Sequence, residues 1–371
     1  MSAALDQGTL QSDRYVVNHD IMNCTAEGVI GNQLYSGRAL GLSEPWDIIQ
    51  LHPDLKPDWP AITEHYQRIG LRHSISVIWD LSLKHLGTHI GFYPSVFYFG
   101  PKECTYWGDQ DWLEAVEFIN SKNNFMELAE KLNVDVPITF CFDRIDDITT
   151  DHIKSIVYPC YLKAAISVSG VGIYRCADEE QFLEAKSKFD DSVPVQIQEE
   201  VITETFLNLQ YRIVDDEVIR LTASEQILDG FVHQGNRVPA SHEPWENVDA
   251  MAYWLKDNGM KGIFAFDVAI MQTEQGLRFP AIECNPRFNG ASYPTMIAQK
   301  MNISEWSSIT LKTQHRSLND FDFSGLEYDH QTGEGLIIVN WGTISVGKIS
   351  VLLAGSKDYQ HALAVELEAR L

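Results

Sequence analysis

Acidic, amide and guanidinium side chains alternate with hydrophobic residues in the stretch 262–290. In its first part the hydrophobic residues recur at every second position, so Asp267 must point to the opposite face of a strand. Further on, Glu283, Asn285 and Arg287 share one face by the same period of two. If the two parts pair as an antiparallel hairpin, these four polar side chains converge on one patch.

The side chains of this patch suit a metal ion beside a phosphate. Mg²⁺, or Mn²⁺ in its place, takes oxygen ligands, usually one or two carboxylates together with substrate phosphates. Asp267, Glu283 and Asn285 supply such oxygens, and Arg287 can stabilise charge that develops on a phosphoryl group. The alternative is the solvent-facing polar side of an ordinary hairpin. The alternating face, the Asn-Pro-Arg turn and the acidic partner strand occur together, which favours the metal site.

Residues 282–290 resemble the E-x-N-P-R-x-x-G element of the ATP-grasp family. They are preceded by a stretch similar to the family's usual glycine–hydrophobic–aspartate strand. This resemblance implies that Asp267, Glu283 and Asn285 bind Mg²⁺. It also implies that Arg287 contacts the γ-phosphate of ATP and acts in catalysis.

Residues 158–163 are similar to the family's strand that ends in a phosphate-binding lysine, here Lys163, to which the resemblance gives a catalytic role as well. The glycine-rich stretch 167–172 resembles the small loop that closes over the phosphates. Glycines permit unusual φ angles, and successive amide groups form an anion nest. The chain departs from the family in having Ala164 directly after the lysine and in the shortness of the loop. The ATP-binding loop residues implied are Ser169, Gly170 and Gly172.

Three more stretches resemble parts of the family's ligand sites. Lys122, at the start of an expected helix, looks like the first nucleotide-binding lysine. Residues 195–202 resemble the strand and hinge where backbone groups bind adenine and an acidic residue binds ribose. The loop 231–239 is similar to the substrate loop of amino-acid and peptide ligases. The hinge candidates are Glu199, Glu200 and Ile202, and the substrate candidates are His233, Arg237 and Asn289.

The resemblance covers residues 118–312 in order, and it implies the fold class and the domain boundaries. We expect an α+β and α/β protein with the ATP-grasp fold, in which two α+β subdomains clasp ATP. An α/β pre-grasp domain would precede them and a small C-terminal lobe would follow. The expected ranges are 1–118 for the pre-grasp domain, 119–200 for ATP-grasp subdomain A, 201–313 for subdomain B with the metal site, and 314–371 for the C-terminal lobe.

Hydrophobic periodicity and capping residues predict the elements around these motifs. Ser121 and Asp178 can each cap a helix, and the pattern over 245–258 predicts another helix. Two buried strands are expected near the N-terminus, at 75–79 and 95–99. Further strands are expected over 157–163, 172–176, 195–199, 206–214, 217–223, 262–271 and 277–285.

A competing nucleotide motif lies near the C-terminus, where residues 342–349 nearly match the P-loop pattern G-x-x-x-x-G-K-[ST]. Ile349 stands where the hydroxyl that contacts Mg²⁺ is needed. The flanking residues also alternate as strands and do not continue into a helix. We therefore interpret residues 336–353 as a β-hairpin, followed by a helix from Asp358.

The formal net charge of -24 disfavours partners with phosphate backbones or anionic membrane surfaces. We expect no nucleic-acid partner and no membrane partner. The 6 cysteines are scattered without a C-x-x-C pair, which favours reduced thiols and a cytoplasmic location. The N-terminus has no basic segment followed by an apolar run, so no signal peptide is expected.

Together the motifs predict an ATP-dependent carboxylate–amine ligase. It would form an amide or peptide bond through an acyl phosphate and release ADP and phosphate. The expected partners are small carboxylate and amine substrates, such as amino acids or short peptides, and a homodimer is one option for its assembly. Two alternatives stay open: a kinase of the same fold that phosphorylates a small molecule, and a module that binds ATP without turnover.

Overall fold

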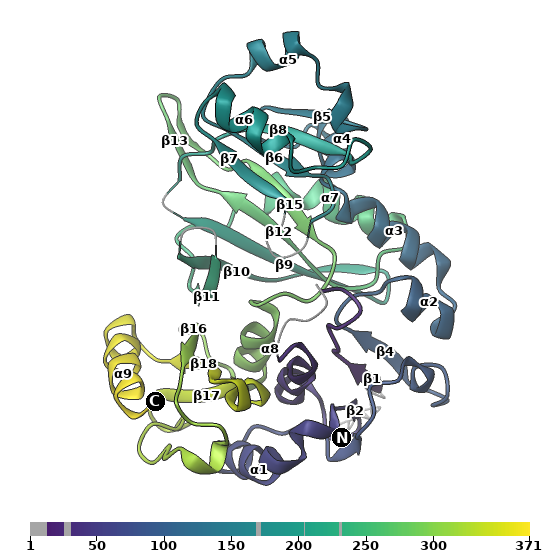
Figure 1. Ribbon diagram of the computed structural model, residues 1–371. Helices are drawn as coiled ribbons and strands as arrows, with labels where there is room; N and C mark the ends of the chain where they lie inside the picture. The colour runs from purple at the N-terminus through teal and green to yellow at the C-terminus, as the bar shows by residue number, and fades with distance from the viewer. Residues whose placement is uncertain (1–12, 26–30, 168–171, 204, 230–231) are drawn as a thin grey trace, which may run out of the picture.

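The computed structural model describes residues 13–25, 31–167, 172–203, 205–229 and 232–371 of the 371-residue chain. Within these residues the strands form a four-stranded parallel sheet, an eight-stranded sheet, a four-stranded antiparallel sheet and a two-stranded ribbon. Figure 1 shows the parallel sheet and the C-terminal elements at the base, the large sheet in the middle and the small antiparallel sheet at the top.

The parallel sheet lies near the N-terminus and has the order β3-β2-β1-β4. Its strands are β1 (Tyr15–Asn18), β2 (Ile48–Gln50), β3 (Ser76–Ile78) and β4 (Tyr93–Val96), and its helices include η1 (Asn32–Leu42), η2 (Pro53–Asp58), α1 (Trp59–Arg68) and α2 (Pro101–Trp107). The strands expected at 75–79 and 95–99 exist in shortened or shifted form. The expectation that 75–79 is buried is wrong: β3 is an edge strand, and Ile75 beside it is 78% exposed.

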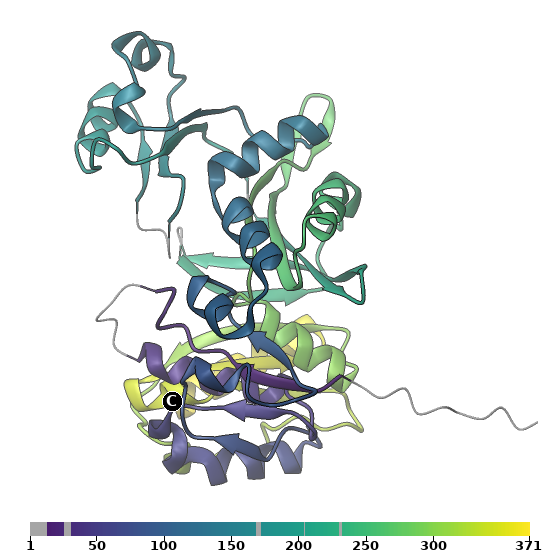
Figure 2. The ribbon, with the colours of Figure 1, turned by 90° about the vertical axis from the view of Figure 1, so that its right-hand side faces the viewer.

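The small antiparallel sheet forms an upper lobe with the order β5-β8-β6-β7. Ser121 accepts a hydrogen bond from the amide of Asn124, and Asp178 accepts one from Gln181, so both predicted helix caps are confirmed. In Figure 2 this lobe projects from the large sheet on the side away from the parallel sheet. Its strands are β5 (Thr139–Phe142), β6 (Cys160–Ala164), β7 (Ile173–Cys176) and β8 (Val195–Glu199), and its helices include α4 (Lys122–Leu132), α5 (Thr150–Ser155) and α6 (Glu179–Lys186).

The large sheet has the order β15-β12-β9-β10-β11-β16-β18-β17. Its strands are β9 (Phe206–Val214), β10 (Glu217–Asp229), β11 (Val232–Val238), β12 (Gly262–Ala269), β15 (Ala281–Asn285), β16 (Trp306–Lys312), β17 (Gly335–Asn340) and β18 (Lys348–Ala354). The remaining helices and strands are α3 (Gln110–Asn120), α7 (Asp249–Asp257), α8 (Ser292–Met301), α9 (Lys357–Arg370), β13 (Met271–Thr273) and β14 (Gly276–Arg278). The predicted strand at 206–214 is confirmed in full, whereas the one at 277–285 is divided between β14 and β15.

The near match to a P-loop lies in a hairpin, as expected. β17 and β18 pair in antiparallel orientation, and a 3₁₀ turn over Gly342–Val346 joins them. Because no helix follows the glycine turn, its amide groups cannot form the phosphate cradle of a P-loop. The helix expected from Asp358 is confirmed as α9.

The C-terminal segment packs into the core of the N-terminal region. Trp341 is fully buried and donates from its indole nitrogen to the carbonyl of Gly37 at 2.7 Å. The hydroxyl of Tyr66 donates to the carbonyl of Ile338 at 2.9 Å. One hydrophobic cluster therefore contains residues from both ends of the chain. The large sheet also continues through β16 into β18 and β17, so the C-terminal residues join two cores.

A partly buried polar contact joins the same two regions. Glu327 receives hydrogen bonds from His65 Nδ1 at 2.7 Å and from Arg68 Nε at 2.8 Å. Nε2 of His65 accepts from the amide of Ile338, so Nδ1 carries the proton. Burial opposes the ionisation of Glu327, but these donors outweigh it and lower its pKa to about 2 from an ordinary 4.5.

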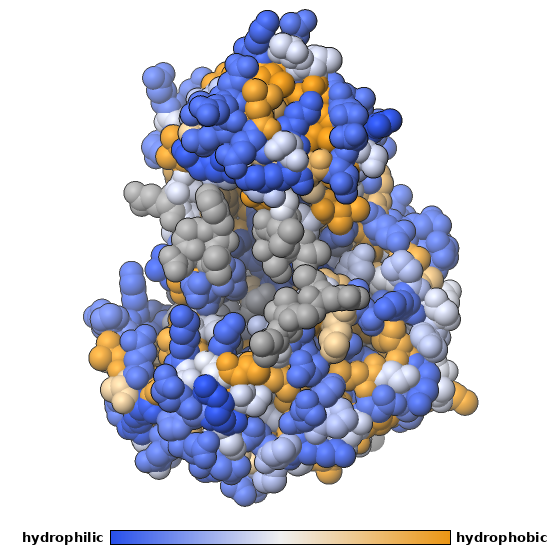
Figure 3. Space-filling model, in the orientation of Figure 1, coloured by the Kyte–Doolittle hydropathy of each residue, from blue (hydrophilic) through white to orange (hydrophobic). Residues whose placement is uncertain are grey.

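Hydrophilic residues cover most of the face seen in Figure 3. None of the helices in the described residues combines the length and apolar character needed to cross a bilayer. All six cysteines are free thiols, and Cys160, Cys176 and Cys284 are buried.

We expect Glu327→Gln to lower the free energy of unfolding at pH 7 by about 1–3 kcal/mol, because a partly buried, charge-assisted contact is lost. The folded-state pKa of Glu327 lies below the ordinary value, so its contribution is complete above about pH 4.5 and is lost as the pH falls towards 2. Urea unfolding of both proteins at pH 7, 4.5 and 3 should therefore show the difference shrinking with acid. Glu64→Gln, on the exposed face of α1, is the matched control, with an expected change within about 0.5 kcal/mol.

Candidate active site

The two acidic residues of the predicted metal site lie directly opposite each other. β12 and β15 pair in antiparallel orientation, and Asp267 is the cross-strand partner of Glu283. Asn285 donates from its side-chain nitrogen to Asp267 Oδ2 at 3.0 Å. The hairpin that the alternating pattern predicted is thus present, with both carboxylates on one face.

Two more amide side chains surround Asp267. Asn208 is its partner on β9 and donates to Asp267 Oδ1 at 2.7 Å, and Gln226 on β10 donates to the same oxygen at 2.8 Å. Asn289 donates in turn to Asn208 Oδ1 at 3.5 Å and thereby joins this network. Neither Asn208 nor Gln226 is among the site residues predicted from the sequence. For Asn208 the signal was a polar residue at a period-two position of a predicted hydrophobic strand, whereas Gln226 is only partly buried and lies beyond the strand expected at 217–223.

The two carboxylates titrate differently because their surroundings differ. Burial, and then the neighbouring Glu283, raise the pKa of Asp267. Burial also opposes the ionisation of Glu283, but Lys122 and Lys163 outweigh it and hold the pKa of Glu283 below its ordinary value. The pair therefore carries its negative charge mainly on Glu283, next to the lysines.

Both predicted phosphate-binding lysines come from the upper lobe. Lys122, the first residue of α4, lies 2.9 Å from Glu283 Oε2 and also donates to Ser167 Oγ at 3.1 Å. Lys163 on β6 donates to Gln198 Oε1 at 2.6 Å. Burial lowers the pKa of Lys163 to about 8, and attraction to Glu283 opposes that shift. The ion pair of Lys122 with Glu283 connects the upper lobe to the large sheet.

Arg287 lies where β15 leaves the large sheet. Its guanidinium carbon is 5.4 Å from the centre of the Phe97 ring, and its Nη1 donates to the carbonyl of Phe288 at 3.1 Å. Its positive charge lowers the pKa of both Asp267 and Glu283, although burial of the two carboxylates is the larger influence. Arg287 therefore stands at the edge of the carboxylate pair.

The hinge candidates lie at the end of β8. The backbone amide of Glu199 donates to the carbonyl of Ile138, and its carboxylate accepts from the amide of Ile138 at 2.8 Å. Glu200 is bound by Arg175 through two hydrogen bonds of 2.5 and 3.1 Å. Ile202 is 81% exposed. The backbone amides of both glutamates thus donate within the chain, to the carbonyls of Ile138 and Pro159.

The substrate candidates divide into two groups. His233 hydrogen-bonds Asn236 at 2.7 Å, and its ring lies so close to Gly290 that a Cβ there would stand 2.6 Å from it. Arg237 is instead bound to Glu225, at 2.6 Å, and is 45% exposed. The structure therefore brings His233 to the loop after β15, beside Asn289, and directs Arg237 towards a carboxylate of its own strand pair.

The glycine loop is only partly described. Ser169 and Gly170 lie outside the described residues. Gly172 has a φ of +78°, which favours glycine, and its carbonyl accepts from the amide of Ala164 at 2.8 Å. The loop thus ends directly beside the strand that carries Lys163.

The donor set fits Mg²⁺ bound together with a nucleotide. No cluster of three His, Cys, Asp or Glu residues suited to a metal occurs in the described part of the chain. Two carboxylates and the amide oxygen of Asn285 leave positions for phosphate oxygens, as Mg²⁺ prefers. Gln196, the partner of Lys163 across β6 and β8, is fully buried, and neither polar atom of its side chain has a hydrogen-bond partner among the residues that the structure describes. Such orphaned groups beside a buried lysine are typical of a ligand site.

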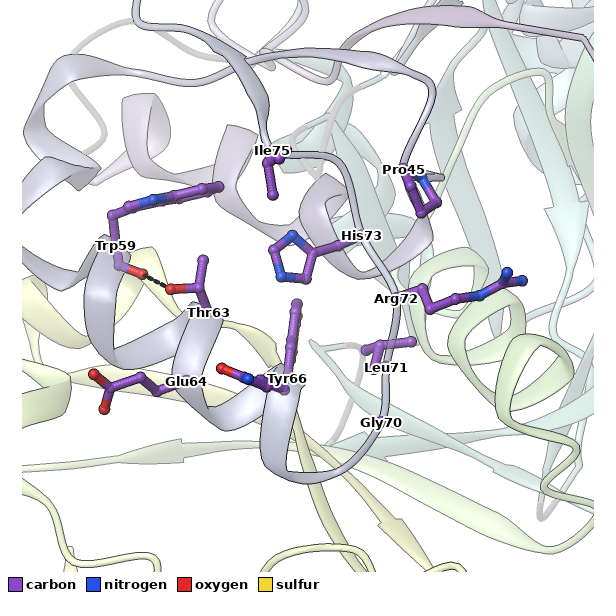
Figure 4. Close-up of a pocket in the computed structure, with 11 residues that line it drawn as sticks. Pro45, Trp59, Thr63, Glu64, Tyr66, Gly70, Leu71, Arg72, His73 and Ile75 are labelled. Carbon is purple, nitrogen blue, oxygen red and sulfur yellow. Dashed lines mark hydrogen bonds between the residues drawn. The ribbon is translucent and has the colours of Figure 1, made fainter.

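A pocket of about 580 Å³ lies elsewhere, beside α1. Trp59, Tyr66 and His73 line it together with Arg72 and Ile75, as Figure 4 shows. It contains none of the predicted site residues. The carboxylates and lysines described above, and not this pocket, combine oxygen ligands with phosphate-binding cations.

The arrangement of sheets and helices is the ATP-grasp fold, with a parallel-sheet domain before the two halves of the grasp. Among solved structures the chain resembles N5-carboxyaminoimidazole synthetase from Staphylococcus aureus complexed with ADP, with a TM-score of 0.60, 10% identity and 97% of each chain covered. It also resembles N5-carboxyaminoimidazole synthase from Aspergillus clavatus in complex with ADP and 5-aminoimidazole ribonucleotide. There the TM-score is 0.54 at 11% identity, over 89% of this chain and 100% of that one.

A third similar structure is N5-carboxyaminoimidazole ribonucleotide synthetase from Thermus thermophilus, with a TM-score of 0.53, 14% identity and coverage of 97% and 98%. Identities this low establish a shared fold and leave the substrate open. No protein-family model and no curated protein sequence matches the chain.

The two carboxylates should respond oppositely to neutralisation. Glu283→Gln leaves the buried Lys122 without its carboxylate partner, so we expect the free energy of unfolding to fall by about 1–3 kcal/mol, measured by thermal unfolding without nucleotide. Asp267→Asn removes repulsion from Glu283, and Asn285 can turn its oxygen towards the new amide. We expect its unfolding temperature to equal or exceed that of the wild type. A larger loss for Asp267→Asn than for Glu283→Gln would contradict this account of the pair.

Proposed function

We propose that the chain is an ATP-dependent, ADP-forming ligase that joins a carboxylate to an amine. One observation carries the proposal: Asp267 and Glu283 face each other on paired strands, with Lys122 ion-paired to Glu283. Two carboxylates held beside cations of the opposite lobe are what a magnesium-bound triphosphate needs. The likeness in fold to synthetases solved with ADP supports this reading.

ATP would bind between the upper lobe and the large sheet. Lys122 and Lys163 would contact its phosphates, Gly172 would lie at the phosphate loop, and the hinge residues would hold the adenosine. Mg²⁺, or Mn²⁺, would be held by Asp267, Glu283 and Asn285 and would neutralise charge on the phosphates. Lys122 pairs with Glu283 in this structure. Phosphate oxygens would therefore have to replace Glu283 as the partner of Lys122 before Glu283 could bind the metal.

The reaction would proceed by two displacements. A substrate carboxylate oxygen attacks the γ-phosphorus, the bond to the β–γ bridging oxygen breaks, and ADP leaves with that electron pair. An amine then attacks the acyl carbon, loses a proton and expels inorganic phosphate. Arg287 and Lys163 would stabilise charge on the transferring group, so positioning and electrostatics supply the catalysis.

The two proposed substrates are a small carboxylate and a small amine. Amino acids and short peptides are the prediction from the loop that contains His233. One of the similar structures contains 5-aminoimidazole ribonucleotide, which also presents an amine. A coupled assay for ADP release should therefore include amino acids, dipeptides, bicarbonate and this ribonucleotide, singly and in pairs.

The proposed ligase should release ADP only when a carboxylate is present, and an amide should appear in the mass spectrum of the product. A phosphorylated product without an amine step would identify the kinase instead. ATP binding in calorimetry, with no ADP release from any pair, would favour the module that binds ATP without turnover. We further propose that the protein acts in the cytoplasm, since its cysteines are all free.

Arg287→Ala tests the proposed catalytic role most directly. We expect kcat to fall by about 10²–10³-fold, because a cation that stabilises the transition state is lost, while ATP affinity changes little. Steady-state kinetics and calorimetry with ATP separate the two effects. Arg144→Ala, at an exposed arginine of the upper lobe, is the control and should retain wild-type kinetics. Turnover that persists in Arg287→Ala would remove this residue from the mechanism.

A further inference from the structure

Arg38 is a buried cation that the proposed reaction has not used. It lies on η1 of the N-terminal domain and is 8% exposed. Its guanidinium carbon lies 4.2 Å from the ring centre of Tyr293, 4.7 Å from that of Phe97 and 5.0 Å from that of Tyr35. These three rings hold the guanidinium in place without neutralising its charge.

One edge of a guanidinium, formed by Nε and Nη2, commonly binds carboxylates. In Arg38 this edge has no partner in the described residues. Its Nε and Nη2 are both buried and make no hydrogen bond there. These two nitrogens donate in parallel and match the two oxygens of a carboxylate or phosphate. Other arginines of this chain use that edge to bind a carboxylate in this way, namely Arg68 with Glu327, Arg175 with Glu200 and Arg278 with Asp135.

A second unpaired guanidinium lies close to the first. Arg287 contacts the same Phe97 ring, and within the described residues neither arginine forms an ion pair. The nearby carboxylates of Asp20 and Glu103 accept hydrogen bonds from backbone amides, at 3.1 Å each, instead of pairing with these arginines. In a chain of net charge -24, two adjacent arginines without a carboxylate partner are costly unless an anion joins them.

We propose that Arg38 binds an oxyanion group, carboxylate or phosphate, of the substrate that is not the nucleotide, on the side of Arg287 away from the metal ligands. This inference rests on the proposed function for the substrate's role, but the binding itself does not require ATP. The site would hold the second substrate between the N-terminal domain and the loop after β15. Its anionic group would supply the negative charge that the two arginines lack as a partner.

Thermal unfolding in the absence of nucleotide tests the binding, with sodium acetate and inorganic phosphate as separate probes. We expect one or both anions to raise the unfolding temperature of the wild type. Arg38→Met should need at least tenfold more anion for the same rise. Without anion, Arg38→Met should unfold at the wild-type temperature or above it, because a buried unpaired charge is removed. A merely structural arginine would give a lower temperature.

Arg14→Met is the matched control. Arg14 also lies over an aromatic ring, that of Phe92 at 4.5 Å, and should respond to anions like the wild type when replaced. If Arg38→Met does not fold, Arg38→Lys keeps the charge but loses the parallel donors, and it should also bind the anions more weakly. Stabilisation by acetate alone identifies a carboxylate, and stabilisation by phosphate alone identifies a phosphate ester.

Equal responses of the wild type and Arg38→Met, or no stabilisation of the wild type by either anion, would overturn the assignment. Failure of the ligase proposal has a different signature. Anion binding would still depend on Arg38, but ADP release would not depend on a carboxylate. If ligation is found, Arg38→Met should raise KM for the anionic substrate at least tenfold and leave KM for ATP near its wild-type value.

Discussion

Two carboxylates on neighbouring strands repel each other, and much of the site follows from how this protein holds them together. Asp267 is enclosed by amide donors from three strands, and Glu283 is paired with Lys122 of the upper lobe. The amide donors favour the ionised form of Asp267, but burial and the charge of Glu283 outweigh them, whereas Lys122 favours an ionised Glu283. In this structure, Lys122 and the amide groups stabilise the negative charge of the two carboxylates. A magnesium-bound nucleotide would displace these groups and stabilise the same charge.

The large sheet gives these side chains their fixed positions. β9, β12 and β15 lie side by side, so Asn208, Asp267 and Glu283 are cross-strand neighbours in one row across the sheet. The other end of the sheet, through β16 and β18, is anchored in the core that the C-terminal residues share with the N-terminal domain. That core also positions η1 against α8, which brings Arg38 over the ring of Tyr293.

Local patterns predicted the elements well where each pattern depends on its own residues. The strands at 195–199 and 206–214 and the helices after Ser121 and Asp178 occur as expected, since alternation and capping are short-range effects. The strand at 75–79 was wrongly expected to be buried. An apolar run reports a preference for burial, but its place at the sheet edge depends on which strands pair beside it.

The sequence by itself determined which side chains share a face: a period of two placed Asp267 opposite its hydrophobic neighbours and aligned Glu283 with Asn285. It also showed that residues 336–353 form a hairpin, because a P-loop needs a helix that the pattern lacks. Only the tertiary structure decided that Lys122 pairs with Glu283, that Asn208 and Gln226 enclose Asp267, and that Arg38 and Arg287 both lie beside the ring of Phe97. These contacts join residues far apart in the chain. Periodicity predicts the direction of a side chain but not the residue that it contacts.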